Sequence, residues 1–295
     1  MTVAIADPYA PPSVGTLRGR AVVRVRRRRK SRAAILDRVA IGFLVLISVT
    51  AFVTPLIAPH KPNLVAGGPM VHPGLHFLLG TDEVGRDILS RVLFGLRASW
   101  FASLAVIASG VLIGGLIGLV AGAAGGWVDD VLMRLTDVFL ALPGPILAIA
   151  VVAALGPSLQ HTLIAVAAVW WPFYARIVRG EVKALAARPH LEAARLAGVG
   201  RVRLAVRHLL PGAIPATMVT ASLDVGNLVL TLAGLSFLGL GAPAPAPELG
   251  AMAARGLTYL LREWWVPVMP GLAVMLLALL SNLAGDGMRD LLGDR

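Results

Sequence analysis

The sequence predicts an all-α integral membrane protein with six transmembrane helices and both termini in the cytoplasm. Three observations lead to this fold class: the composition, the long stretches without charge, and the distribution of basic residues between those stretches. Of the 295 residues, 57% are hydrophobic and 15% are charged, whereas soluble domains carry about 25% charged residues. The composition therefore excludes an ordinary soluble domain.

Long uncharged stretches mark the spans, because a helix needs about 20 mostly apolar residues to cross the hydrocarbon. The stretches are Val39–His60, Ala98–Val128, Val138–Ala175, Leu209–Pro243 and Trp264–Gly285, the fourth containing one charged residue, Asp224. The third is too long for one helix, and we expect it to break at Gly156-Pro157. With that break, the stretches predict six helices.

The basic residues predict the orientation, because Lys and Arg are retained on the cytoplasmic side. With a cytoplasmic N-terminus, the inside segments hold 21 of the 27 Lys and Arg residues and the outside segments hold six. Both termini are therefore expected in the cytoplasm. In this topology Asp129, Asp130 and Arg134 lie in a short cytoplasmic loop.

The first 33 residues are predicted to be a disordered basic tail on the cytoplasmic side, followed by a membrane domain over 34–295. The net charge of +11 and the run Arg26–Lys30 could suggest a nucleic-acid partner. A basic cluster directly before a first span is more typical of a topology signal that contacts anionic lipid headgroups. We therefore expect membrane lipid, and no nucleic acid, as a partner of this segment.

The external segment 61–97 combines a loop with a predicted amphipathic helix at the outer interface. Apolar residues recur at helical spacing, and Asp82/Arg86 and Asp87/Arg91 are spaced as i,i+4 ion pairs. Thr81 or Asp82 would cap the helix. The recurring apolar residues are Val84, Ile88, Leu89, Val92, Leu93 and Leu96.

The second span carries glycine at every fourth residue, which removes side chains from one helix face and favours close packing against another helix. The pattern leaves open whether that helix belongs to this subunit or to a partner subunit. The glycines are Gly110, Gly114, Gly118, Gly122 and Gly126.

Polar groups inside a span are candidates for function. Asp224 and Asn227 lie one turn apart in the fifth span and share a face. They either line a translocation pathway or form hydrogen bonds within the helix bundle, and the sequence leaves both interpretations open.

The segment 176–208 is too charged for lipid and too apolar for a simple loop, which predicts short amphipathic helices broken at Gly198 and Gly200. Within it, Ala193 and Ala194 offer a small face, and Glu192 offers a carboxylate. These features predict a cytoplasmic docking surface for another protein.

Catalytic motifs are missing from the sequence. A P-loop needs a lysine that follows a glycine, and none of Lys30, Lys61 and Lys183 does. The chain has no cysteine, and His72 and His76 flank Pro73 and Gly74, which disfavour the helix that would align two histidine ligands. We therefore expect no catalytic residue, metal site or cofactor in this chain.

Four motifs together resemble one family. Glu192-Ala193-Ala194, Gly198 and Leu210-Pro211 resemble the cytoplasmic EAA loop of ABC importer permeases, with His208 where that pattern has isoleucine. The segments Leu79–Arg91, Leu235–Gly241 and Asn282–Asp290 resemble motifs of the dipeptide, oligopeptide and nickel importer permeases, in particular of their C-type subunit. One departure is that 231–234 is neutral where this family often has an acidic residue.

The resemblance implies the MetI-like permease fold and a prokaryotic cell membrane location. It implies that residues of the EAA loop form a coupling helix that docks on an ATPase, and that a family motif lies in the external segment. The docking residues would be Glu192, Ala193, Ala194, Arg195, Gly198, Leu210 and Pro211, and the external motif residues Gly80, Thr81, Asp82, Gly85, Arg86 and Asp87.

The resemblance also implies the partners: a B-type permease subunit, one or two ATPase subunits that use ATP and Mg²⁺, and an external solute-binding protein. The expected cargo is a di- or oligopeptide, and the alternative within this architecture is a nickel chelate or haem. From a different class, an ion-driven secondary transporter would need a coupling carboxylate, for which Asp224 is the candidate.

Overall fold

The computed structural model describes residues 42–43 and 45–293, and the described part is almost entirely helical. A short apolar helix over Val45–Ile57 precedes the external segment. The elements that follow are α2 (Ile88–Ala124), α3 (Gly126–Leu140), α4 (Gly144–Leu155), α5 (Leu159–Ala186), α6 (Pro189–Leu196), α7 (Arg201–Leu204), a π-helical turn (Ala205–Leu209), α8 (Leu210–Phe237), α9 (Leu249–Gly256), a 3₁₀ turn (Leu257–Tyr259) and α10 (Trp265–Gly293).

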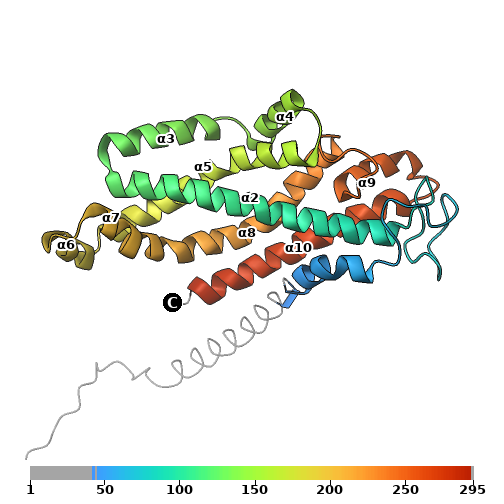
Figure 1. Cartoon of the computed structure of the whole chain (residues 1–295), viewed down its shortest axis with the longest axis horizontal. Helices are drawn as coiled ribbons and strands as arrows, with labels where there is room; N and C mark the ends of the chain where they lie inside the picture. Colours follow the sequence, from blue (N-terminus) through green and yellow to red (C-terminus); the bar gives the residue numbers. More distant parts are fainter. Residues whose placement is uncertain (1–41, 44, 294–295) are drawn as a thin grey trace, which may run out of the picture.

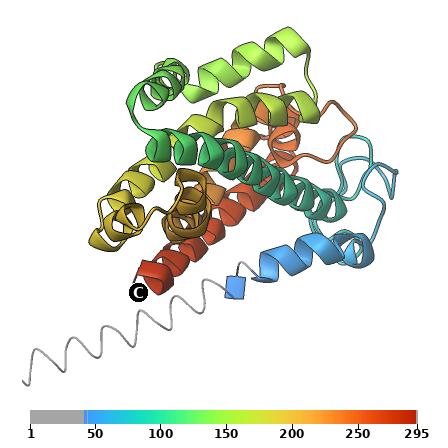
Figure 2. The same ribbon diagram turned by 60° about the vertical axis from the view of Figure 1, so that its left-hand side comes forward.

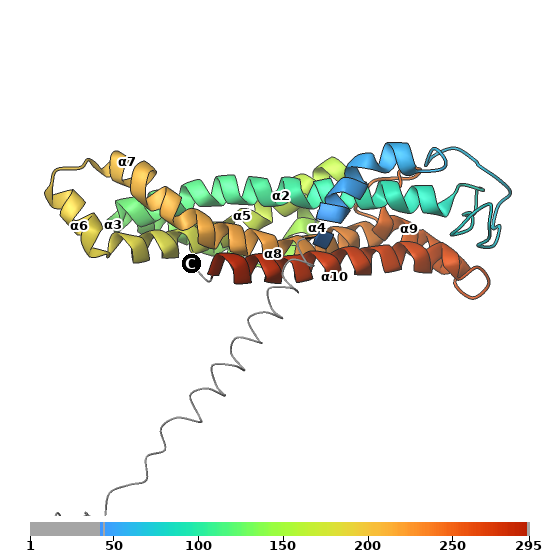
Figure 3. The same ribbon diagram turned by 90° about the horizontal axis from the view of Figure 1, so that it is seen from below.

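The long helices lie roughly along the length of an elongated molecule (Figure 1). The gold segment with α6 and α7 lies at one end, and α9 with the cyan loop that precedes α2 lies at the other, an arrangement that Figures 2 and 3 also show. Because α6 and α7 lie in the predicted cytoplasmic segment 176–208, we name their end the cytoplasmic end and the opposite end the external end.

Four helices of the described part are long and apolar enough to cross a membrane: Ile88–Ala124, Leu159–Ala186, Arg201–Phe237 and Trp265–Arg289. The pair α3 and α4, bent by 81°, is a fifth candidate if it forms one broken span. The first predicted span begins at Val39, which lies outside the described residues. The predicted tail 1–33 also lies outside them. The count of six spans and the position of the termini stay predictions.

The expected interface helix is corrected by the structure. Residues 82–86 form a turn, and α2 runs without interruption from Ile88 to Ala124. Asp87 is the N-cap of α2, and its carboxylate accepts a hydrogen bond from the backbone N–H of Ser90, so neither Thr81 nor Asp82 is the cap. The reason is Gly85, whose φ of +84° reverses the chain just before α2.

The expected cytoplasmic loop with Asp129, Asp130 and Arg134 is also corrected, because these residues lie in α3. The chain turns at Gly125 and Gly126, both with positive φ, and a helix begins again at once. The expected break at Gly156-Pro157 is present between α4 and α5.

Three groups of buried apolar side chains hold the elements together. The largest contains residues of α2, α4, α5, α8 and α10, for example Val106, Val166 and Leu228. A second group at the cytoplasmic end packs Leu191 and Leu204 against the ends of α2, α5 and α8. A third group of α2, α9 and α10 residues lies at the external end.

Candidate functional site

The EAA segment, residues 189–204 with α6 and α7, projects from the cytoplasmic end and does not follow the bundle along its length (Figure 3). It is fixed by two buried leucines, Leu191 and Leu204, which pack with the apolar ends of α5 and α8. Outside this anchor most side chains face away from the chain: Glu192, Ala193 and Arg195 are exposed and Ala194 is half-buried.

Gly198 ends α6 in a conformation that other residues rarely adopt. Its φ is +83°, its N–H donates to the carbonyl of Arg195, and the N–H of Val199 donates to the carbonyl of Ala194. These two bonds form the Schellman motif, which closes the C-terminus of a helix and reverses the chain. A Cβ at Gly198 would meet nothing within 4 Å, so the backbone angle rather than space requires glycine.

Large apolar side chains on this segment face solvent. Leu196 is 90% exposed, Val202 78% and Val206 56%. Exposed arginines stand next to Leu196 and Val202 in the sequence, namely Arg195, Arg201 and Arg203. Leu196 and Val202 lie in the predicted docking surface. The sequence predicted that Ala193 and Ala194 form its small face, but Ala194 packs against the second apolar group of this chain.

The connection from this segment into the membrane is a continuous but irregular helix. Leu210 and Pro211 lie at the start of α8, directly after the π-helical turn Ala205–Leu209, in which the N–H of Leu210 donates to the carbonyl of Ala205. Pro211 has no N–H to donate to the preceding turn, and π-helical turns of this kind occur often at functional sites.

At the external end, residues 80–87 form a compact turn. Polar groups of this turn make hydrogen bonds within the chain. The Thr81 hydroxyl donates to the carbonyl of Gly68 and accepts from the N–H of Val71. Asp82 accepts from the N–H groups of Val84 and Arg86.

Two glycines of this turn combine a positive φ with close packing. Gly80 has φ +77° and lies against the indole of Trp265, and a Cβ at Gly85 would overlap the backbone of Gly67. Side chains larger than hydrogen are therefore excluded twice, by the backbone angle and by space.

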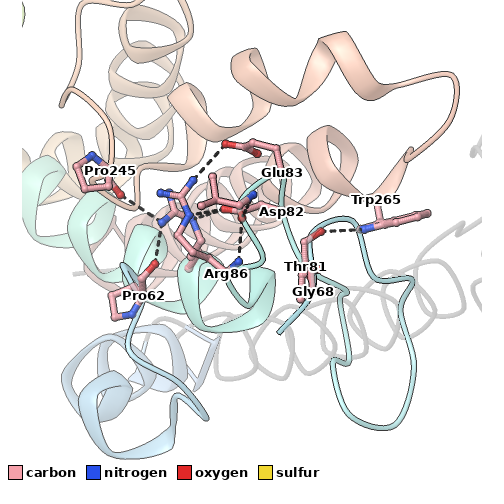
Figure 4. Close-up of polar contacts among 10 residues, drawn as sticks. Pro62, Gly68, Thr81, Asp82, Glu83, Arg86, Pro245 and Trp265 are labelled. Atoms are coloured by element: carbon pink, nitrogen blue, oxygen red, sulfur yellow. Dashed lines mark hydrogen bonds and ion pairs between the residues drawn. The ribbon is translucent and has the colours of Figure 1, made fainter. Parts of the chain in front are cut away.

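Arg91 joins three external segments through polar contacts. Figure 4 labels its partners Pro62, Asp82 and Pro245. Its side chain is 1% exposed, donates to the carbonyls of Pro62 at 2.7 Å and Pro245 at 3.2 Å, and lies 3.5 Å from the carboxylate of Asp82. Asp82 also pairs with Arg86 at 2.7 Å. The expected Asp87/Arg91 pair is thus replaced, because Asp87 caps α2 and Arg91 turns toward Asp82.

The motif Leu235–Gly241 lies at the C-terminal end of α8. It contacts an acidic residue from outside the motif, Glu248. Glu248 accepts hydrogen bonds from the Ser236 hydroxyl and from the N–H of Ala242. Burial raises the pKa of this carboxyl above its ordinary value. The neutral stretch 231–234 therefore does not leave the motif without a carboxylate, because one arrives from the loop before α9.

Asp224 and Asn227 share a helix face but differ in exposure. Asp224 is buried and accepts hydrogen bonds from the indole of Trp170 and from the hydroxyl of Tyr174, at 3.1 Å, both on α5. Asn227 is exposed. The aspartate therefore links α5 to α8, whereas the face of Asn227 is open in the isolated subunit.

The glycine row lies against α5 of the same chain. A Cβ at Gly114 or Gly118 would overlap backbone atoms of α5, and one at Gly110 would meet the ring of Tyr174 at 3.0 Å. Gly122 faces Val182, but Gly126 does not continue the row, because α2 ends at Ala124 and a Cβ at Gly126 would meet nothing within 4 Å.

The sequence reading missed a set of ion pairs between α3 and α5. Asp129 pairs with Arg179 and Lys183, and Asp137 pairs with Arg176. The available signal was spacing: the two aspartates are eight residues apart, about two helical turns, and the three cations recur at intervals of three and four.

Comparison with known proteins places these features in context. Residues 114–295 match the family described as binding-protein-dependent transport system inner membrane component. A relative named probable D,D-dipeptide transport system permease protein DdpC, from Escherichia coli, is 42% identical, with 84% of each chain covered.

Two further relatives carry related names. The di/tripeptide transport system permease protein DppC of Pseudomonas aeruginosa is 41% identical over 85% of each chain. The glutathione transport system permease protein GsiD of Pectobacterium atrosepticum is 39% identical over 86% of this chain and 85% of its own.

The fold is similar to a solved structure of the MetNI methionine ABC transporter in an inward-facing conformation. The TM-score is 0.57 at 20% identity, and the match covers 70% of this chain and 97% of the other. This similarity confirms the predicted MetI-like fold.

Proposed function

This chain belongs to the family of binding-protein-dependent transport system inner membrane components, and from that premise we propose that it forms half of the pathway by which an ATP-driven importer moves di- or oligopeptides. It is a multi-pass permease subunit of a bacterial plasma membrane. It is not itself the enzyme, since the ATPase activity of these transporters lies in separate subunits.

The exposed surface of the cytoplasmic end carries the proposal. Leu196 and Val202 are large apolar side chains on a water-facing projection, where apolar surface of this kind marks a protein interaction site. We assign the segment Glu192–Gly198, with Leu210 and Pro211 behind it, as the docking element for one of one or two ATPase subunits. Those subunits bind ATP and Mg²⁺, and this chain binds no cofactor.

The other partners are a B-type permease subunit, which completes the pathway, and an external solute-binding protein, which delivers the cargo. The external motif residues Gly80, Thr81, Asp82, Gly85, Arg86 and Asp87 form the rigid end of the subunit on the side of the binding protein. The exposed face of Asn227 is our candidate for lining the pathway.

The mechanism is alternating access. Closure of the ATPases displaces α6, and the displacement enters the membrane through α5 on one side and through the π-helical turn and α8 on the other. ATP binding thereby shifts the population between inward-open and outward-open states.

Peptides are the proposed cargo because several relatives are named for dipeptide or tripeptide transport. None of the names quoted above favours a nickel chelate or haem. An ion-driven mechanism has little support, since Asp224, its candidate carboxylate, is buried with hydrogen-bond partners on α5.

Substitution of Gly198 by proline tests the docking element. Proline fixes φ near about −65°, whereas Gly198 has φ +83° and donates its N–H to Arg195. In vesicles that contain the whole transporter, Gly198→Pro should abolish peptide uptake and uncouple ATP hydrolysis from transport.

Gly200→Pro is the matched control. Gly200 has φ −63° and ψ 150°, a conformation that proline adopts without strain. This variant should retain uptake. Normal ATP-driven uptake by Gly198→Pro would contradict the proposed function.

A further inference from the structure

Helix α3 is attached to the rest of the subunit in an unusual way. At its start, Gly125 and Gly126 have φ of +65° and +56°, and a Cβ at either glycine would meet nothing within 4 Å. At its end, Ala141 to Pro143 separate it from α4, and the two helices meet at an angle of 81°. Both connections are short and free of packing restraints at the glycines, so the chain path alone does not fix the angle of α3.

The contact face of α3 is narrow and centred on a charge. The buried residues of this helix are Asp129, Met133 and Thr136, and Phe139 adds an edge contact with the ring of Trp171. Its opposite face is apolar and exposed at Trp127, Val131, Leu135 and Val138. Apolar packing therefore contributes little to holding α3 on α5.

Asp129 supplies the main polar attachment. The aspartate is 3% exposed and accepts two hydrogen bonds from Arg179, at 2.5 and 2.8 Å, and one from Lys183 at 2.6 Å. The fork of a guanidinium on a carboxylate fixes orientation as well as distance. A second pair, Asp137 with Arg176 at 2.5 Å, is exposed on both sides and is screened by solvent.

The two cations lie near the C-terminal end of α5. Arg179 and Lys183 belong to its last two turns, which lead directly to the coupling helix α6. In the same turns, Gly118 and Gly122 of α2 lie against α5 at backbone distance. The end of α5 is thus the point where the coupling segment, α2 and α3 meet.

We propose that Asp129 is a positioning residue for transport: it clamps α3 to the cytoplasmic end of α5, so that displacement of the coupling segment moves α3, and α4 with it, as one unit with α5. This inference rests on the proposed function, since it needs an ATPase that displaces α6. The glycine pair before α3 is the hinge that lets the helix follow α5 without distorting α2.

The charge has a physical advantage over an apolar contact at this place. Asp129 is buried, whereas the side chains of Arg179 and Lys183 are 31% and 45% exposed. Turning α3 away from α5 would leave the buried carboxylate without these partners, so the charge favours one position of α3. The clamp therefore specifies the angle of α3, which a narrow contact of Met133 and Thr136 alone would leave loose.

The test compares Asp129→Asn with Asp130→Asn in vesicles that contain the complete transporter. Both variants lose one negative charge on α3, but Asp130 is exposed. We expect Asp129→Asn to lower ATP-driven uptake about tenfold while ATP hydrolysis persists. A tenfold loss lies in the usual range of coupling free energies between two sites. Asp130→Asn should transport like the parent. Equal uptake by the two variants would overturn the inference.

A second measurement needs no change at Asp129. The chain has no cysteine, so cysteines introduced at the exposed positions Val131 on α3 and Gly180 on α5 are the only labelling sites when the chain is assembled with partner subunits that lack cysteine. The distance between the labels should stay the same without nucleotide and with trapped ATP. A distance that changes with ATP in the otherwise unaltered chain would overturn the clamp.

The two proposals fail in different ways. If the parent transporter shows no ATP-driven uptake, the proposed function is wrong. If the parent and Asp130→Asn transport normally and Asp129→Asn does so too, the proposed function stands and the clamp is wrong.

Discussion

The two ends of this molecule use the same residue types for opposite purposes. At the external end, Arg91 is buried and its donors are used within the chain, by Pro62, Pro245 and Asp82. At the cytoplasmic end, Arg195 is exposed beside the apolar side chain of Leu196. The external end is complete by itself, whereas the cytoplasmic end leaves surface for another protein.

The glycines show the same contrast. Gly85 at the external end and Gly198 at the cytoplasmic end both have a φ of more than +80°. A Cβ at Gly85 would overlap the backbone of Gly67, but one at Gly198 would meet nothing within 4 Å. A motif residue can therefore be required for packing at one end and for backbone shape alone at the other.

The largest expected effect comes from Arg91→Ala. It removes the donor to the carbonyls of Pro62 and Pro245 and leaves Asp82 with one cation fewer. Because the side chains of Arg91 and Asp82 are both buried, breaking their pair costs about 3 to 5 kcal/mol. The melting temperature of the purified protein in detergent should fall strongly. Arg262→Ala, at an exposed external arginine, should change it little; equal shifts would contradict the assignment of Arg91 as the residue that joins three external segments.

The glycine contrast predicts a smaller pair of effects. Gly85→Ala combines backbone strain with overlap and should cost about 2 to 4 kcal/mol of unfolding free energy. Gly198→Ala meets only the left-handed backbone penalty of about 1 kcal/mol. Thermal unfolding of the two variants measures the difference, and a larger loss for Gly198→Ala would reverse our comparison of the ends.

The exposed cytoplasmic surface predicts a binding effect without a stability effect. Leu196→Asp should weaken binding of the ATPase by about 2 kcal/mol, or about thirtyfold, as for an interface hot spot, and should leave the melting temperature unchanged. Leu75→Asp places the same change on a fully exposed leucine of the external segment. Binding of the ATPase, measured by titration in detergent, should be unaffected by it.

The smallest effect is a pH dependence at Glu248, which lies before α9 and outside the candidate spans. Because burial raises the pKa of this carboxyl in the folded state, the folded state binds the proton more readily than the unfolded state. Stability should therefore rise as the pH falls through the raised pKa of the folded state toward the ordinary pKa of a glutamate, and this contribution should be lost at higher pH. Glu248→Gln, which cannot titrate, should lack this pH dependence of the melting temperature. If the variant and the parent show the same pH profile, Glu248 is not its source.

The sequence by itself determined the class of protein, the break at Gly156-Pro157 and the interruption at Gly198. These features follow from local properties: runs of apolar residues partition into lipid, proline lacks a donor, and glycine alone adopts a positive φ freely. The motifs around Glu192 and Asp82 also predicted the family, because their spacing is visible in one chain.

Only the tertiary structure decided which groups meet. The spacing of Asp87 and Arg91 suits a helical ion pair, yet Arg91 turns to Asp82 because three external segments converge there. Asp129 lies 50 residues from Arg179 along the chain, and Glu248 lies 12 from Ser236. Hydrogen bonds and ion pairs form within about 3 Å, and which residues come within that range depends on how the helices pack rather than on local sequence.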